Sequence, residues 1–175
     1  MSNMNVEDIK QKLASDQPQE IHQGLEIIRD EMEDVRDEDL QDMVTLVLPL
    51  FYIDLLDHPE LVPVIDEAIS LVADSGQRVI PWLIDSLDAG DLKAQLAIGQ
   101  ALGRVGVEAI DPLIEAYRST ADPERRIFIL YALGKIESAH LEKALDVAIS
   151  ASHAENPELR DTAVRVIGRF AESIP

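Results

Sequence analysis

The sequence predicts an all-α fold, an α-solenoid of about five antiparallel helical hairpins. Two observations carry this prediction. A five-residue motif begins at residues 101, 132 and 166, so that its spacings are 31 and 34 residues, and such periods are typical of helical repeats. The composition is 46% hydrophobic but only 4% aromatic, which leaves the core to Leu, Ile, Val and Ala, as in stacked helices.

The motif reads Ala-Leu-Gly-Arg-Val at 101–105, Ala-Leu-Gly-Lys-Ile at 132–136 and Val-Ile-Gly-Arg-Phe at 166–170. Aligning the three copies gives apolar columns at offsets of three, four and seven, which mark one face of a helix. These columns are Ile98/Ile129/Ala163, Ala101/Ala132/Val166, Leu102/Leu133/Ile167 and Val105/Ile136/Phe170. Another set of apolar columns, beginning at Ile80, Ile110 and Leu141, predicts a first helix before each of these second helices.

Turn signals separate the paired helices at 88–91, 121–124 and 155–158, where Gly or Pro stands beside Asp, Asn or Glu. We therefore predict hairpins at about 77–106, 107–137 and 138–175. Upstream the pattern is weaker, but Leu48-Pro49 and the Asp-His-Pro-Glu sequence at 57–60 predict a hairpin at 38–76. The Gln17-Pro18 turn predicts a first hairpin at 5–36. Because no hairpin can bury its apolar face alone, we expect residues 1–175 to form a single domain.

These motifs resemble the HEAT-repeat family, in the short bacterial form also found in phycobilin lyases. The matching segments are Asp-Pro-Leu-Ile at 111–114, Asp-Pro-Glu-Arg-Arg at 122–126, residues 132–136, and Asn-Pro-Glu-Leu-Arg at 156–160. The resemblance is strong over residues 77–175. It implies a scaffold whose groove is lined by second helices, and it implies that Arg126 and Arg160 bond neighbouring repeats. From their spacing in a helical repeat, Gly99, Gly103 and Gly106 are interpreted as packing positions.

The formal net charge of −19 repels phosphate backbones, so nucleic-acid binding is disfavoured. The chain has no cysteine, which suits a reducing compartment, and its first 12 residues lack the apolar core of a signal peptide. The longest apolar stretch, residues 43–56, falls short of the about 20 residues that a membrane span needs. We expect a cytoplasmic protein that does not enter a membrane.

Catalytic and metal-binding patterns are missing from the sequence. The four histidines are spread over three predicted hairpins, no two lie at i and i+4, and none is followed by Glu. No phosphate-binding glycine motif and no nucleophile elbow occurs. We therefore expect no enzyme activity, no cofactor and no metal.

The second helix of the fourth predicted hairpin is apolar on every side at residues 127–133. Its core stripe contains Ile129 and Leu133, so Ile127 and Tyr131 fall on the opposite face, which would line the groove. An exposed apolar patch there favours protein binding. The alternatives are burial under a loop, under a capping segment or against a second copy, so a homodimer stays open. The candidate protein-binding residues are Leu96, Gln100, Ile127, Tyr131 and Arg165.

The densest charge in the chain lies at 30–42, with eight acids and one base. It is a weaker candidate for docking a basic partner, and a solvated cap is the alternative. Its acidic residues are Asp30, Glu31, Glu33, Asp34, Asp37, Glu38, Asp39 and Asp42.

Three further features each have two interpretations. The recurring cations Arg104, Lys135 and Arg169 either bind anions or complement helix dipoles, and the second is favoured. Trp82 either anchors a partner or packs between hairpins. The apolar segment 44–56, expected to be helical, either packs on both neighbouring hairpins or forms a dimer interface.

The sequence therefore predicts a non-enzymatic scaffold or adaptor that binds another protein through the face formed by its second helices. The alternative is a phycobilin-lyase-like factor that matures a cofactor-bearing protein, and this alternative rests on the resemblance.

Overall fold

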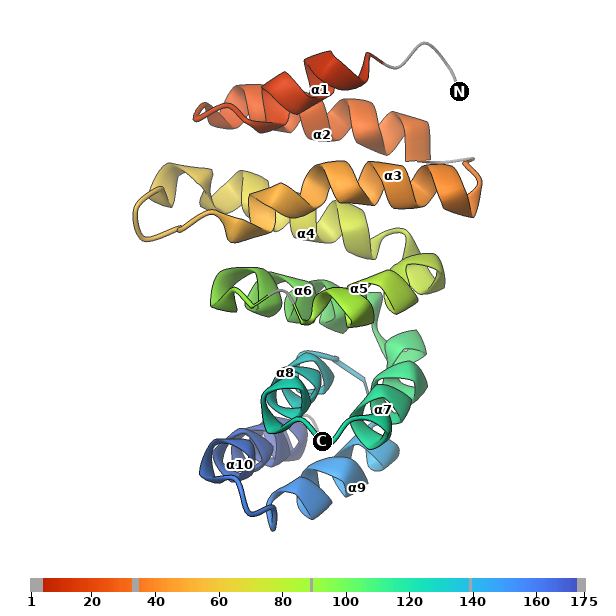
Figure 1. Cartoon of the computed structure of the whole chain (residues 1–175), viewed down its shortest axis with the longest axis vertical. Coiled ribbons are helices and arrows are strands. Elements are labelled where there is room, and N and C mark those ends of the chain that lie inside the picture. Colours follow the sequence, from red (N-terminus) through yellow and green to blue (C-terminus); the bar gives the residue numbers. More distant parts are fainter. Residues whose placement is uncertain (1–4, 33–34, 89, 139, 173–175) are drawn as a thin grey trace. The chain divides into compact units, whose positions relative to one another are not determined.

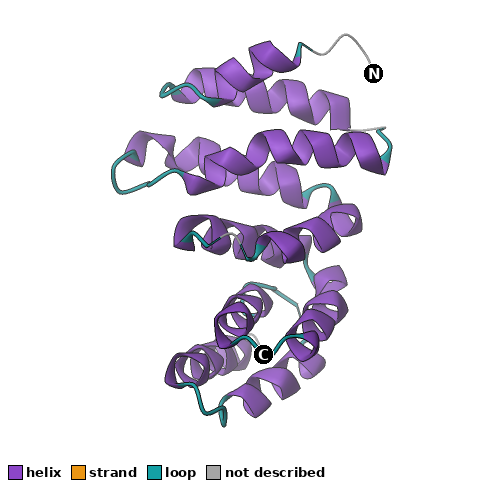
Figure 2. Cartoon of the chain, in the orientation of Figure 1, coloured by secondary structure: helices purple, strands orange, loops and turns teal. Residues whose placement is uncertain are grey.

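The protein is described here from a computed structural model that places residues 5–32, 35–88, 90–138 and 140–172. These residues form ten α-helices, interspersed with short 3-10 helices, and they include no strand (Figures 1 and 2). The prediction of an all-α fold is confirmed. No helix in the described ranges is both long and apolar enough to cross a membrane.

The chain divides into two compact units, residues 1–75 and residues 76–175. The predicted boundary between the second and third hairpins, at residues 76 and 77, falls at this division. Whether the two units fold together as the single domain predicted from the sequence stays a prediction. The two units are described separately below as unit 1 and unit 2.

Unit 1 begins with α1 (Val6–Leu13) and α2 (Pro18–Met32), which pack against each other around Ile9, Ile21 and Leu25. It continues with α3 (Asp37–Val47), two 3-10 helices, η1 (Leu48–Tyr52) and η2 (Pro59–Leu61), and α4 (Val62–Ala73). The contacts of α4 with α2 and η1 close the core of this unit.

The predicted helix at 44–56 is wrong in its second half. Regular α-helix ends at Val47, and the chain continues through η1 into a loop in which Leu56 is 92% exposed. Pro49 stands in the first turn of η1, where it has no N–H to give to an α-helical bond and disfavours α-helix just before it. Within the described residues, the apolar segment therefore packs as two shorter pieces inside unit 1.

Unit 2 contains three helical pairs, seen in order along the chain in Figure 1. They are α5 (Ile80–Ser86) with α6 (Leu92–Val105), α7 (Ile110–Ser119) with α8 (Pro123–Leu133), and α9 (Glu142–Ala151) with α10 (Pro157–Glu172). The short 3-10 helices η3 (Gly76–Val79) and η4 (Val107–Ala109) lead into α5 and α7. The second helices pack in series, α6 on α8 and α8 on α10. Most positions of the apolar columns read from the sequence are core: Ile98, Ile129 and Ala163 are all at most 2% exposed, whereas Leu145 and Ile167 in the last hairpin are partly exposed.

Each second helix of unit 2 begins at an Asp or Asn that satisfies backbone N–H groups of the first turn. Asp91 accepts bonds from the N–H of Lys93 and Ala94 at 2.9 and 3.1 Å. Asp122 accepts bonds from the N–H of Glu124 and Arg125 at 3.1 and 3.4 Å. Asn156 accepts a bond from the N–H of Leu159 at 2.9 Å. These caps explain why helices start at the predicted turn signals.

Glycines set the distance between successive second helices. A Cβ on Gly99 would lie 2.6 Å from the Tyr131 ring, and a Cβ on Gly134 would lie 2.8 Å from Cγ2 of Val166. A Cβ on Gly103 would meet the backbone oxygen of Lys135 at 2.9 Å. Such distances leave no room for a side chain. Gly99 and Gly103 are therefore packing positions, as predicted from their spacing.

Candidate functional site

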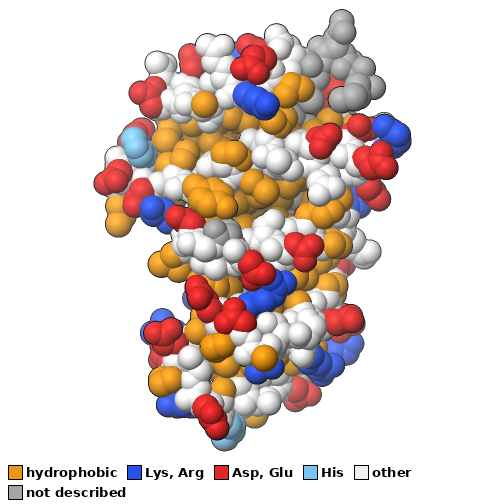
Figure 3. Space-filling view, viewed as in Figure 1, with side chains coloured by type: hydrophobic (Ala, Val, Ile, Leu, Met, Phe, Trp, Pro, Cys, Tyr) orange, Lys and Arg blue, Asp and Glu red, His pale blue; other side chains and the backbone are white. Residues whose placement is uncertain are grey.

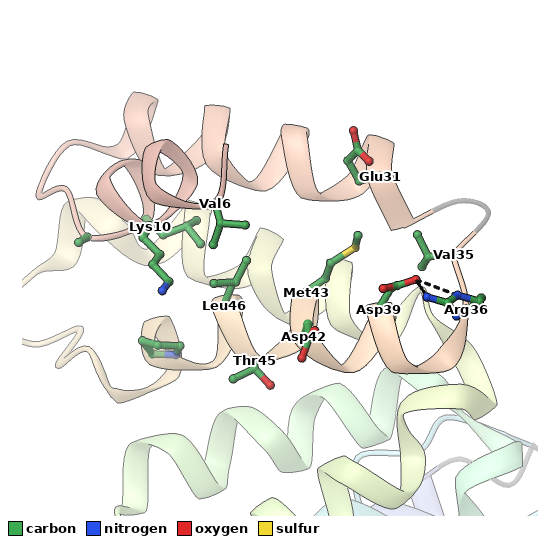
Figure 4. Close-up of a pocket in the computed structure, with 13 residues that line it drawn as sticks. Val6, Lys10, Glu31, Val35, Arg36, Asp39, Asp42, Met43, Thr45 and Leu46 are labelled. Carbon is green, nitrogen blue, oxygen red and sulfur yellow. Dashed lines mark hydrogen bonds and ion pairs between the residues drawn. The ribbon is translucent and has the colours of Figure 1, made fainter. Parts of the chain in front are cut away.

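A pocket of about 840 Å³ lies in unit 1, between α1, the C-terminal end of α2 and α3 (Figure 4). Most of its wall is apolar and is formed by Val6, Leu13, Val35, Met43 and Leu46. Figure 4 shows Val6 and Leu46 turned toward each other across the space, with Met43 beside them. This volume lies in the range of binding sites that take large apolar groups.

The pocket lies beside the N-terminal end of α1. Among the described residues, α1 has eight residues and α2 has 15, so the described part of α1 covers only part of α2 at about 1.5 Å per residue. The part of α2 near Glu31 and the N-terminal half of α3 then face a space that no described helix fills. Apolar side chains gather between α1 and α3 on the face seen in Figure 3.

Carboxylates stand around this apolar wall. Glu31, Asp39 and Asp42 line the pocket together with two cations, Lys10 and Arg36. Arg36 donates to Oδ2 of Asp39 from Nε at 3.2 Å and from its terminal nitrogen at 3.1 Å, so that this pair largely cancels. We refer to this site below as the acid-rimmed pocket.

The structure gives the predicted acidic run several different surroundings. Glu31, Asp39 and Asp42 line the acid-rimmed pocket, whereas Asp30 lines a smaller hollow formed by α1 and α2. The carboxylates of Asp37 and Glu38 are exposed in the first turn of α3, where they complement the helix dipole. Glu33 and Asp34 lie outside the described residues.

The residues predicted to bind a partner lie on unit 2, on the second helices. We refer to them as the second-helix face: Leu96 and Gln100 on α6, Ile127 and Tyr131 on α8, and Arg165 on α10. The first four are only partly exposed. The Tyr131 ring packs on Gly99, and Nζ of Lys135 lies 5.1 Å from its centroid. Arg165 is exposed and pairs with Asp161 at 2.6 Å.

Two of the three recurring cations meet near this face. Arg104 and Lys135 line a hollow of about 460 Å³ together with Gln100 and Glu137. The carboxylate of Glu137 would repel an anion bound in this hollow, and Lys135 already lies over the Tyr131 ring. Arg104 and Arg169 stand in the last turn of α6 and α10, where a cation complements the helix dipole. Trp82 is partly buried on α5, where its carbonyl accepts a bond from Ser86.

A repeated hydrogen bond in unit 2 was not predicted. Gln95, Arg126 and Arg160 occupy one column, with the same spacings of 31 and 34 residues as the motif. Gln95 is only 5% exposed, and its Nε2 donates to the carbonyl of Leu87 at 2.9 Å. Each of the three side chains bonds a backbone carbonyl at or beyond the C-terminal end of the first helix in its own hairpin. Alignment of this column with the motif is the signal that would have found it.

The expectation that Arg126 and Arg160 bond neighbouring repeats is therefore wrong for their observed bonds. Nε of Arg126 donates to the carbonyl of Tyr117 at 3.3 Å, and its guanidinium lies 4.9 Å from the ring centroid. Burial raises the pKa of Tyr117 above its ordinary value, and the Arg126 charge partly opposes this. Arg160 donates to the carbonyls of Ala154 and Glu155 at 2.8 and 2.7 Å.

Other side chains join successive hairpins of unit 2. Arg125 pairs with Asp88, which follows α5, and also reaches the carbonyl of Ile84. Lys143 on α9 pairs with Asp111 on α7 at 2.8 Å. Sequence reasoning missed Arg125 because the family pattern directed attention to its neighbour Arg126.

Unit 1 also contains a charged cluster between α2 and α4. Nδ1 of His22 lies 2.7 Å from Glu67, and Arg29 donates to the other oxygen of Glu67 at 3.3 Å. The hydrogen bond that His22 donates to Glu67, followed by the charge of that carboxylate, raises the pKa of His22 above its ordinary value of 6.5. Glu67 is the most covered of the three side chains, at 19% exposure.

No group of three His, Asp or Glu side chains within the described ranges is arranged to hold a metal ion. No family of known proteins, no curated protein and no solved structure matches this chain. The functional argument therefore rests on the chemistry of the two units themselves.

Proposed function

We propose that this protein is a HEAT-like adaptor that binds another protein, and that the acid-rimmed pocket receives a basic amphipathic segment of that partner. The observation that carries the proposal is the composition of the pocket, an apolar wall formed by residues such as Val6, Met43 and Leu46 beside carboxylates. A docked helix would pack its apolar side chains against this wall, and its cations would face the carboxylates at the rim.

The charge of this chain indicates the charge that the partner segment should carry. The chain carries a net −19, and residues 1–60 hold 16 acids against four bases. Within the described part of the chain, Glu31 and Asp42 line the rim without an ion pair, and Asp39 pairs with Arg36. A field of this kind attracts a basic segment from a distance and repels an acidic one.

The second-helix face is a further binding surface for the same function. The observation that favours it is the partly exposed Tyr131 ring, which packs on Gly99. A rigid, partly exposed aromatic side chain is typical of residues that contribute strongly to protein interfaces. Contacts made here would add to those at the acid-rimmed pocket, so each surface is tested by its own variants.

A maturation factor for a cofactor-bearing protein is the second proposal, because a pocket of about 840 Å³ is large enough for a sizeable ligand. The carboxylates at its rim argue against bilins, since these carry propionate groups of the same charge. Co-expression with a bilin tests this alternative. A coloured, purified protein would favour it, and a colourless protein would count against it.

The adaptor proposal is tested with short fluorescent peptides that form amphipathic helices of leucine and lysine. We expect the leucine–lysine peptide to bind and its affinity to fall as salt rises. A peptide with glutamate in place of lysine, and another with serine in place of leucine, should both bind far more weakly. Equal binding of all three peptides, or none at all, would contradict the proposal.

Matched variants locate the binding site. Asp42→Lys reverses a charge at the rim and should weaken peptide binding by about tenfold. Asp57→Lys, which makes the same change in an exposed loop of unit 1, is its control. Leu46→Asp tests the apolar wall against Leu56→Asp, because Leu56 is 92% exposed and lies outside the pocket. Circular dichroism checks that each variant keeps its helices.

A further inference from the structure

One face of α10 exposes residues whose equivalents on α6 and α8, the earlier second helices of unit 2, are buried or partly buried. On α6 these positions are Gln95, Gly99, Leu102 and Gly103, and all four are buried against the rest of unit 2. On α8 the matching Leu130, Leu133 and Gly134 are also buried, and Arg126 is partly buried. On α10 the same columns hold the residues that we call the end face: Arg160, Val164, Ile167 and Gly168.

Within the described residues, the end face is open. Val164 is 59% exposed, Ile167 is partly exposed, and no described atom lies within 4 Å of the position that a Cβ on Gly168 would take. At the matching position of α8, a Cβ on Gly134 would meet Cγ2 of Val166 on the next helix at 2.8 Å. The apolar side chains and the glycine that receive another helix are thus present on α10, and no described helix covers them.

The first helix of the same hairpin repeats this pattern. Leu145 on α9 aligns with Ile84 on α5 and Ile114 on α7, which are 7% and 4% exposed. Leu145 is itself only partly covered, and Ile149, one turn further along, is 45% exposed. Apolar exposure of this kind over two adjacent helices marks an interaction surface.

We propose that the end face binds the end face of a second copy of this chain, with the two α10 helices packed antiparallel about a twofold axis. In this arrangement Val164 of each copy lies over Gly168 of the other. A valine over a glycine is the contact that Val166 and Gly134 already make inside the chain. A twofold interface needs such a self-complementary pair, because each residue meets its partner's counterpart twice.

Charge favours the second copy as the occupant. A chain of net charge −19 repels its own copies at most surfaces, but α10 balances three arginines against three acids. The register that pairs Val164 with Gly168 places the twofold axis at position 166. On its N-terminal side Glu158 and Asp161 balance Arg160 and Arg165, and on its C-terminal side Arg169 balances Glu172. Antiparallel pairing therefore sets Arg160 of each copy at the level of Glu172 of the other, brings no net charge together and also opposes the helix dipoles.

The test is sedimentation velocity of the whole protein from low to high micromolar concentration. We expect a reversible shift from monomer to dimer, since one helix pair buries a small area and such interfaces are weak. A monomer at every concentration would overturn the proposal. A mass that grows past the dimer would overturn it as well, because that result indicates head-to-tail stacking rather than a twofold pair.

Variants assign the surface. Val164→Asp should raise the dimer dissociation constant by about 100-fold or more, since a twofold interface receives each buried carboxylate twice. Leu92→Asp is the matched control, because Leu92 on α6 is 61% exposed and lies away from the end face. Dimerisation that survives Val164→Asp, or that is lost in Leu92→Asp, would contradict the assignment.

Cross-linking tests the register without depending on affinity. The chain has no cysteine, so Val164→Cys and Gly168→Cys proteins can be mixed under mild oxidation. We expect the disulfide-linked heterodimer to form faster than either homodimer, and faster than the heterodimer of Leu92→Cys with Gly168→Cys. Equal rates for all pairs would overturn the antiparallel register.

Discussion

The hairpins of unit 2 are built with one repeated set of contacts, whereas each hairpin of unit 1 is held in its own way. In unit 2, Asp91, Asp122 and Asn156 cap the second helices, and a side chain in the column of Gln95 bonds a carbonyl within each hairpin. In unit 1, α3 follows Arg36, which makes no capping hydrogen bond to it, and the chain passes through two 3-10 helices before α4.

The comparison relates regularity to function. Glycines that meet the next second helix, Gly99 at Tyr131 and Gly134 at Val166, close the space between the second helices of unit 2. Where the repeat pattern weakens, in unit 1, the described parts of α1, α2 and α3 surround the acid-rimmed pocket. The irregular unit therefore has the larger cavity, about 840 Å³ against about 460 Å³ for the hollow beside Arg104 and Lys135 in unit 2.

The largest expected effect comes from closing a glycine contact of unit 2. Gly103→Leu should lower the free energy of unfolding by about 3 kcal/mol or more, because Lys135 and its backbone occupy the space that the side chain would need. Gly168→Ala, at the same column of α10, should instead raise it by about 1 kcal/mol, since alanine favours helix and no described atom is close. Urea unfolding at low, monomeric concentration measures both. Equal effects at the two glycines would contradict the repeated contact.

The side-chain bond of Gln95 ranks next. Gln95→Leu should cost about 1–3 kcal/mol, because the buried carbonyl of Leu87 loses its donor. Arg160→Leu should cost less than that, since Arg160 is exposed and water can replace its bonds to Ala154 and Glu155. Chemical unfolding of the two variants, side by side, decides this order. The reverse order would show that burial does not control how much these side-chain hydrogen bonds stabilise the protein.

Helix capping gives a smaller difference between the units. Asp122→Ala should destabilise the protein by about 1 kcal/mol, because the N–H groups of Glu124 and Arg125 lose their acceptor. Arg36→Ala removes no capping bond from α3 and loses only an exposed pair with Asp39, so its expected cost is at most about 0.5 kcal/mol. Thermal unfolding compares the two variants. A larger loss for Arg36→Ala would contradict the assignment of caps.

The smallest expected effect is a pH dependence confined to unit 1. Because the pKa of His22 is raised, its pairing with Glu67 adds stability that is fully present below the ordinary pKa of 6.5 and is lost as pH rises through the higher pKa of the folded state. NMR titration of the imidazole should show this raised pKa, and Glu67→Gln should lower it toward 6.5. An unchanged His22 pKa in Glu67→Gln would contradict the pairing.

The sequence predicted unit 2 well because its repeat places equivalent residues in equivalent surroundings. The stripe containing Ile129 and Leu133 is buried as predicted, and helices begin at the predicted turns. The bonds of Arg126 were predicted wrongly, since that expectation rested on the HEAT-repeat resemblance alone, whereas Nε of Arg126 donates to the carbonyl of Tyr117 in the same hairpin. Partner binding at the second-helix face stays a prediction.

In unit 1 the sequence predicted the acidic run but not the pocket beside it. The pocket lies where the eight described residues of α1 cover only part of the 15-residue α2, and where α3 ends soon after Leu46, just before Pro49. Such helix bounds carry no periodic signal. The role proposed for Asp42 can therefore be recognised only when the apolar wall next to it is known.

The central claim is that partner binding takes place at the acid-rimmed pocket of unit 1. Backbone amide NMR of the whole chain, titrated with the leucine–lysine peptide, tests it most directly. The account predicts saturable shifts centred on Val6, Leu13, Met43 and Leu46, and their loss in Asp42→Lys. Shifts confined to the second-helix face around Tyr131, or spread evenly over the acidic surface, would contradict it.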